Sequence, residues 1–274
     1  MSSVLSFFLF MPRKAIPSQQ LPWPRRVLTP AEAVKFINAL GYCMLFPVAN
    51  IPLPSLYCAV TGRSPDEDLY FDKYFAMIWR WKDDLPRRRR ALYAKYFRGR
   101  GTLISLEQLQ YFLSMREAAV APSDHERLYA EGRITNDARV IWQALDEHGP
   151  LATLELRHTC KMETTAGNIR FKRAMLDLQR LLLVTHFGSE QETGAWASNR
   201  FELICRAFPE QTAEAFEISP EEARARLAAK YIEWRPEAAV ATLARLFGWS
   251  KDDAIKAHGA AQRQPQTKMK ERRK

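Results

Sequence analysis

A helix is predicted where the first ordered pattern of hydrophobic residues begins. Thr29-Pro30-Ala31-Glu32 combines a capping hydroxyl, a proline at the first helical position and a reciprocal glutamate, so the helix is expected to start here and to stop at Gly41. Three prolines between positions 47 and 54 then interrupt the chain. Residues 53–61 therefore hold a short helix at most.

Further helices are predicted downstream of these prolines. Apolar residues recur close to helical spacing over 70–81, and Leu85-Pro86 is expected to end that helix and to begin another over 87–97. Arg98-Gly99-Arg100-Gly101 predicts a turn, and Ser105-Leu106-Glu107-Gln108 opens a helix after it.

The segment 136–208 has the most informative pattern. It reads as three helices and a hairpin: helices over 136–148, 153–160 and 168–182, and strand-like runs over 183–187 and 201–204. This order is typical of the winged-helix variant of helix-turn-helix. Other small helical domains share the helix pattern, and winged helices also serve protein contacts.

A third helical unit follows a second strong capping box at Ser219-Pro220-Glu221-Glu222. It has no room for a wing, which indicates a truncated repeat. The expected fold class is mainly α with short β-hairpins, in tandem winged-helix units. The predicted parts are a flexible basic leader (1–26), an N-terminal winged-helix-like domain (27–130), a central winged-helix domain (131–216), a truncated three-helix unit (217–260) and a basic disordered tail (261–274).

The net charge of +10 is unevenly distributed. Residues 1–26 carry +4 and residues 261–274 carry +5, so the part between them is nearly neutral. Within it, residues 73–100 hold ten basic residues against Asp83 and Asp84. A local basic patch of this kind is typical of a surface that binds polyanions.

Cysteine usage predicts a reducing compartment, and hydropathy predicts no membrane-spanning segment. The four cysteines are scattered without a C-x-x-C pair, which indicates free thiols. No segment approaches the roughly 18 apolar residues of a membrane span, and residues 4–11 lack the flanks of a secretory signal. We expect a cytoplasmic, nucleoid-associated protein without membrane contact.

Catalytic and cofactor motifs are sparse. The five histidines lack metal-site spacing and are expected at surface or capping positions, and the sequence has no glycine-rich nucleotide loop and no nucleophile elbow. No cofactor and no metal are therefore expected. The acids within or beside the basic region, Asp83, Asp84 and Glu107, are the remaining catalytic candidates, and pairing with arginines is their alternative role.

Double-stranded DNA, intact or damaged, is the partner that the basic residues favour. Aromatic residues interleave with them and could stack on bases, although helical spacing favours inward packing of Tyr74 and Trp79. The four consecutive arginines spread over a helical turn and cannot all point one way. The candidate DNA-binding residues are Arg80, Lys82, Arg87, Arg88, Arg90, Lys95, Arg98 and Arg100, with Arg170, Arg173 and Arg180 on the exposed face of helix 168–182.

Four stretches resemble a known family. Residues 40–50, read Leu-Gly-Tyr-Cys-Met-Leu-Phe-Pro-Val-Ala-Asn, with Leu53-Pro54-Ser55-Leu56-Tyr57, resemble the N-terminal signature of AlkZ/YcaQ-type DNA glycosylases. Residues 81–86 (Trp-Lys-Asp-Asp-Leu-Pro) and 98–107 (Arg-Gly-Arg-Gly-Thr-Leu-Ile-Ser-Leu-Glu) are similar to their shorter bacterial relatives, the AlkZ-related proteins. The resemblance implies tandem winged helices that act on alkylated DNA.

The family's catalytic pair is missing at its expected place. The glycosylases carry Gln-x-Gln or Gln-x-Asp three and five residues after the Leu-Gly, and this chain has Met44 and Phe46 there. Neither side chain accepts a proton or orients water. These residues could pack inside the domain or wedge against DNA, and packing is the favoured role.

The sequence thus predicts a DNA-binding protein on a glycosylase-like scaffold, acting as a lesion or structure binder or a regulator. One alternative is an active glycosylase that releases alkylated bases with a different residue. Another is a protein-interaction module.

Overall fold

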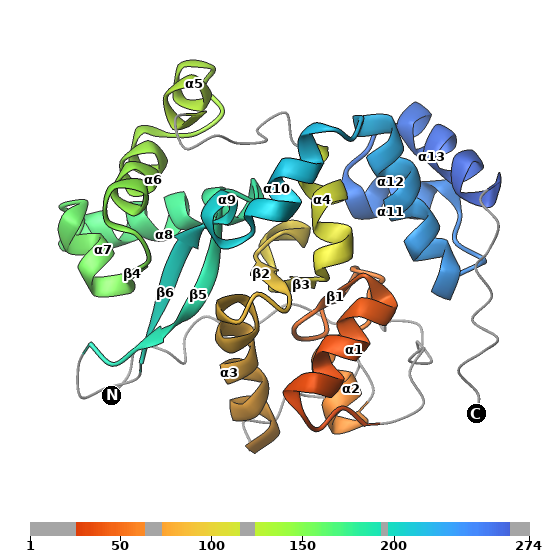
Figure 1. Cartoon of the computed structure of the whole chain (residues 1–274), viewed down its shortest axis with the longest axis horizontal. Coiled ribbons are helices and arrows are strands. Elements are labelled where there is room, and N and C mark those ends of the chain that lie inside the picture. The colour runs from red at the N-terminus through yellow and green to blue at the C-terminus, as the bar shows by residue number, and fades with distance from the viewer. Residues whose placement is uncertain (1–25, 64–72, 116–123, 193–196, 264–274) are drawn as a thin grey trace.

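A computed structural model describes residues 26–63, 73–115, 124–192 and 197–263 of the 274-residue chain. This part of the protein is mainly helical and includes two three-stranded antiparallel sheets (Figure 1). The expected class, mainly α with short hairpins, is confirmed at that level. Within these ranges, no helix combines the length and the apolar composition that a membrane crossing requires.

The first sheet belongs to what we call the N-terminal unit. Strands β1 and β2 both pair with β3, so the strand order is β1-β3-β2. The unit follows the chain as α1 (Pro30–Leu40), β1 (Tyr42–Met44), α2 (Leu56–Thr61), α3 (Lys73–Arg87), β2 (Leu92–Ala94) and β3 (Thr102–Ile104).

The second sheet belongs to the central unit, which repeats this arrangement. Strands β4 and β5 both pair with β6, giving the order β4-β6-β5. The elements are α6 (Asn136–His148), β4 (Leu151–Ala152), α7 (Thr153–Thr159), α8 (Thr165–Arg180), β5 (Val184–Glu190) and β6 (Ser198–Leu203). In each unit the order is helix, strand, two helices and two strands, with the last strand in the middle of the sheet.

The remaining helices connect and cover these units. The short 3-10 helix η2 lies between β2 and β3, α5 packs on α6, and α10 and α11 pack on α4. Their bounds are η2 (Phe97–Gly99), α4 (Leu106–Ser114), α5 (Asp124–Ala130), α9 (Ile204–Ala207), α10 (Pro209–Phe216), α11 (Pro220–Trp234), α12 (Val240–Phe247) and α13 (Lys251–Arg263).

Strand β1 separates two hydrophobic cores. Successive side chains of a strand point to opposite faces. Cys43 and Leu45 accordingly face the core under α1, α2 and α3, whereas Tyr42 and Met44 face a core that includes α4 and the C-terminal helices. The sheet is therefore covered on both sides, and its short strands are fully buried.

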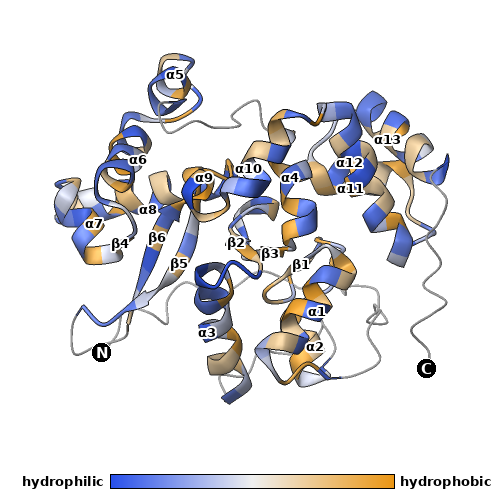
Figure 2. Cartoon of the chain, in the orientation of Figure 1, coloured by the Kyte–Doolittle hydropathy of each residue, from blue (hydrophilic) through white to orange (hydrophobic). Residues whose placement is uncertain are grey.

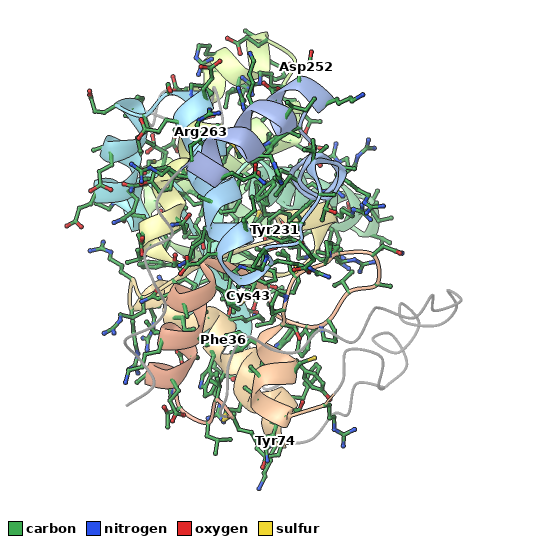
Figure 3. All side chains as sticks on the ribbon, turned by 90° about the vertical axis from the view of Figure 1, so that its right-hand side faces the viewer. Phe36, Cys43, Tyr74, Tyr231, Asp252 and Arg263 are labelled. Carbon is green, nitrogen blue, oxygen red and sulfur yellow. The ribbon has the colours of Figure 1, made fainter. Side chains whose placement is uncertain are left out.

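The C-terminal helices α11 to α13 pack with the N-terminal unit in the core that Tyr42 and Met44 face. Figure 3 shows Tyr231 of α11 between α13, which carries Asp252 and Arg263, and the layer that contains Cys43. Tyr231 is fully buried, and its hydroxyl donates to the Pro52 carbonyl at 3.1 Å. The three helices thus pack directly on residues near the start of the chain.

Several sequence predictions are confirmed. The Thr29 hydroxyl accepts the Glu32 amide at 3.2 Å, and the Glu32 carboxylate accepts the Thr29 amide at 3.0 Å, which completes the capping box. Helices near the other predicted positions are present, as is the hairpin β5–β6. Two boundaries move: α8 starts at Thr165 because Thr164 caps it, and α13 continues to Arg263, into the predicted tail.

The predicted helix break at Leu85-Pro86 is wrong. Helix α3 runs through Pro86 to Arg87. A proline in a last turn removes the helical donor of one carbonyl only, here that of Lys82. The Arg88 amide closes the helix on the Asp84 carbonyl at 3.0 Å, and the Arg90 amide donates to the Leu85 carbonyl at 2.9 Å.

The helix predicted over 87–97 is also wrong. Residues 88–90 form an exposed turn that is strongly hydrophilic in Figure 2, and Arg89 adopts a left-handed conformation with φ of 50°. Leu92–Ala94 then forms β2 against β3. A three-residue strand buried on both faces shows no alternation of polar and apolar positions, so its period cannot be recognised.

Tyr42→Phe is expected to lower the free energy of unfolding by about 1 kcal/mol. The buried Tyr42 hydroxyl donates to the Leu227 carbonyl at 2.9 Å and ties β1 to α11. Urea denaturation followed by far-ultraviolet circular dichroism measures the change. Tyr129→Phe is the control, since Tyr129 is 41% exposed and its hydroxyl has no hydrogen bond within the described ranges. An equal loss in both variants contradicts this role of Tyr42.

Candidate nucleic-acid interface

A buried polar cluster joins α3 of the N-terminal unit to the hairpin of the central unit, where α3 lies along β5 (Figure 1). Nζ of Lys82 donates to both carboxylate oxygens of Asp83 at 2.7 Å and to Oδ1 of Asn199 at 2.8 Å. Nδ1 of His186 lies 2.9 Å from Oδ1 of Asp83. We call these four side chains the interunit cluster.

Burial sets the protonation of the interunit cluster. Desolvation lowers the pKa of His186 to about 4, against the opposing effect of Asp83, so the ring is neutral at pH 7. The contact with Asp83 is therefore a hydrogen bond donated by Nδ1–H, because a bare Nδ1 would face the carboxylate lone pairs. Desolvation also lowers the pKa of Lys82, although the Asp83 charge counteracts it.

This cluster corrects the expected exposure of Lys82 and His186, and it places Asp83 in the interior. Lys82, expected on the DNA-binding surface, is 1% exposed and already bonded, so it does not face solvent. Asp83, a catalytic candidate, is buried and occupied by Lys82 and His186. His186, expected at a surface or capping position, is buried in β5.

The burial of Lys82 has a signal in the sequence. Three neighbours of Lys82 on the helix are buried: Ile78 four residues before it, Trp81 one residue before it and Leu85 three residues after it. Helical spacing therefore puts Lys82 on the apolar face of α3. The partners His186 and Asn199 have no such signal, because they lie more than 100 positions away in the chain.

Positions 44 and 46, where the resemblance to the glycosylases would place a catalytic pair, are apolar and packed. Met44 is fully buried in the core shared with α4, which confirms the packing role expected for it. Phe46 is half-buried, and its ring stacks on that of Phe75 with centroids 4.8 Å apart. Trp79, expected to face inward, is 44% exposed, and Nζ of Lys82 lies 4.5 Å from its ring centroid.

Several arginines on α3 and in the turn after it face solvent. Arg80, Arg87, Arg88 and Arg90 are all exposed. The Arg87 side chain packs against Gly188 of β5. A Cβ atom on Gly188 would lie only 2.9 Å from Cδ of Arg87, so the position leaves little room for a side chain. Arg87 also pairs loosely with Asp84 at 3.8 Å, and this pair is largely exposed.

A second group of arginines runs from α8 onto the turn between β2 and β3. Arg170, Arg173 and Arg180 are exposed along one face of α8 and span about 15 Å of helix. Arg180 lies against Gly99 of η2, which is flanked by the exposed Arg98 and Arg100. We call these five arginines the basic stripe. It contains residues from both units.

The catalytic candidates are not brought together. Asp83 and Asp84 lie on α3, whose apolar face packs into the core on one side of the first sheet. Glu107 is exposed in the first turn of α4, whose apolar face packs into the core on the other side. Within the described ranges, no three His, Cys, Asp or Glu side chains gather as a metal site would require.

Acid is expected to destabilise the protein through His186. The pKa of about 4 in the folded chain lies below the usual 6.5, so the unfolded chain binds the proton first as the pH falls. Stability is complete above about pH 6.5 and declines until about pH 4, by about 3 kcal/mol. Urea denaturation across this range measures the loss. His186→Gln is expected to flatten the dependence, and an unchanged pH dependence in that variant contradicts the assignment.

Comparison with known proteins places the chain in a family. The family model described as AlkZ related matches residues 27–248, which is most of the chain. Neither a curated protein nor a solved structure matches it. The matched range includes the interunit cluster, the basic stripe and the apolar positions 44 and 46. The protein therefore belongs to the AlkZ-related family.

Proposed function

We propose that this protein binds double-stranded DNA through two winged-helix units and has no glycosylase activity of the family type. The observation that carries the proposal is the basic stripe, which crosses from one unit to the other. Family membership supports an association with DNA repair, since AlkZ-type proteins are DNA glycosylases.

The winged-helix assignment rests on the repeated topology. Both units have the order helix, strand, two helices and two strands, with the same strand order in the sheet. In a winged helix the third helix enters the major groove. By this correspondence α8 is the recognition helix of the central unit, and α3 occupies the equivalent place in the N-terminal unit.

The charge environment of the stripe favours phosphate contacts. Within the described ranges, Arg98, Arg100, Arg173 and Arg180 have no carboxylate oxygen within 4.0 Å. Arg170 has one, Asp137, at 3.8 Å, and the Arg170 side chain is 59% exposed. Guanidinium groups without internal partners are free to form paired hydrogen bonds with phosphate oxygens. Such contacts position a protein on DNA without reading its sequence.

The apolar packing at positions 44 and 46 favours binding without catalysis. Base release by the family mechanism needs a group that accepts a proton and orients water. Met44 is fully buried and Phe46 stacks on Phe75, so neither offers such a group. A protein that binds lesions or DNA structures, or that acts as a regulator, needs no catalytic group at positions 44 and 46.

Arg170→Ala combined with Arg173→Ala is expected to weaken binding of the full-length protein to a plain duplex about tenfold at moderate salt. The slope of log K against log salt should fall by about two, because two phosphate contacts are lost. Fluorescence anisotropy across a salt series measures both quantities.

Arg226→Ala combined with Lys256→Ala is the control for this experiment. It removes the same charge from α11 and α13, at the opposite end of the molecule from α8 in Figure 1. Binding should be unchanged in the control. Equal affinity and equal salt slopes in all three proteins would leave the basic tails as the source of binding and contradict the proposal. Weak binding with no salt dependence would favour a protein-interaction module.

Release of alkylated bases is expected to be undetectable. Duplexes that carry 7-methylguanine or 3-methyladenine, incubated with the full-length protein and heated in alkali, report any abasic sites formed. Cleavage above the protein-free level would support the rival hypothesis of an active glycosylase. Asp84→Asn and Glu107→Gln then identify the residue, since both carboxylates are on the surface and their loss should not disturb the fold.

A further inference from the structure

The hairpin β2–β3 presents Lys95 to the central unit. Tyr93 precedes it by two residues, so both side chains leave the hairpin on the same face. That face meets β5: the Tyr93 ring lies 4.7 Å from His186, and the Thr185 hydroxyl donates to the Tyr93 carbonyl at 2.8 Å. Lys95 is half-buried at this junction.

Lys95 has no compensating charge in the described part of the chain. Its ammonium forms no hydrogen bond and has no carboxylate within 4.0 Å there. The nearby acid, Asp83, is already occupied by Lys82 and His186. The charge of Lys95 disfavours protonation of both of those groups, which places it near the interunit cluster. The junction thus holds two lysines for one carboxylate, and an unpaired cation at a half-buried position is unfavourable.

Three arginines of the basic stripe extend this positive charge to the surface. Arg100 lies close enough to Lys95 to lower the pKa of Lys95, after burial itself. Arg180 reaches the same turn from α8, where a Cβ on Gly99 would lie 2.8 Å from its Nη2. Arg98 adopts a left-handed conformation, with φ of 51°, that non-glycine residues rarely take. Backbone strain of this kind is concentrated at binding sites.

We propose that Lys95, Arg98, Arg100 and Arg180 form a phosphate site at the junction of the two units, which takes one phosphodiester group of the DNA backbone. This inference rests on the proposed DNA-binding function. One anion between these side chains would offset their mutual repulsion and supply Lys95 with the partner that it lacks. Because Lys95, Arg98 and Arg100 lie between β2 and β3 whereas Arg180 lies on α8, one bound phosphate would also fix the two units relative to each other.

Lys95→Met tests the site through two readouts that move in opposite directions. Removal of the unpaired cation should leave the Tm of the free full-length protein unchanged or raise it. Duplex binding should weaken about threefold to tenfold, and the salt slope should fall by about one. Inorganic phosphate at constant ionic strength should raise the Tm of the wild-type protein and not that of the variant.

Two further variants keep the test decisive. Arg100→Met removes an exposed member of the site, so it should fold normally and also lose the phosphate response. Lys251→Met is the charge-matched control, because Lys251 is exposed on α13 and has no carboxylate partner within the described ranges. It should keep both the affinity and the phosphate response.

The outcomes separate this site from the general function. If Lys95→Met lowers the Tm and leaves affinity intact, Lys95 is structural and the inference is overturned, while loss of binding in the α8 variant would still uphold the proposed function. If the wild-type protein does not bind duplex, the proposed function is wrong, and so is the inference that the site binds a phosphodiester group of DNA. A Lys95-dependent phosphate response in that case would identify a site for free phosphate.

Discussion

A buried polar cluster, built on the ion pair between Lys82 and Asp83 of α3, links the two units where α3 meets β5. Burial of two charges is tolerated only when their remaining hydrogen-bonding capacity is satisfied. Asn199 and the neutral ring of His186 complete that shell from the opposite unit. The cluster is therefore specific: the charges of α3 are satisfied only with this hairpin in this register.

This fixed placement gives the basic residues their geometry. The turn between β2 and β3 lies at the end of α8 while β5 packs on α3 and β2, and Arg180 approaches Gly99 there. A stripe assembled from two units extends further over the surface than the arginines of α8 alone. The geometry of the basic stripe is thus coupled to the integrity of the interunit cluster, which itself does not face solvent.

Local signals in the sequence predict local structure well and contacts between units poorly. The capping box at Thr29, the helical stripe of α8 and the hairpin that follows it were all predictable from spacing and turn residues. Strand β2 was not, because three residues buried on both faces have no period. The exposure of the arginines of α8 was predictable from their spacing on the helix. The burial of Lys82 could have been inferred from helical spacing in the same way. The pairing of α3 with His186 and Asn199 could not, since it joins residues more than 100 positions apart.

The alternation of β1 between two cores limits how this sequence could change over evolution. Position 44 points into an apolar core built from α4 and the C-terminal helices, with no exposed surface. A glutamine introduced there would bury an amide among hydrophobic side chains, at a cost of about 1 to 3 kcal/mol. A polar side chain at position 44 therefore requires compensating changes in the residues around it. Those changes fall on residues contributed by distant parts of the chain, from α4 to the C-terminal helices, so the packing of this core favours an apolar side chain at position 44.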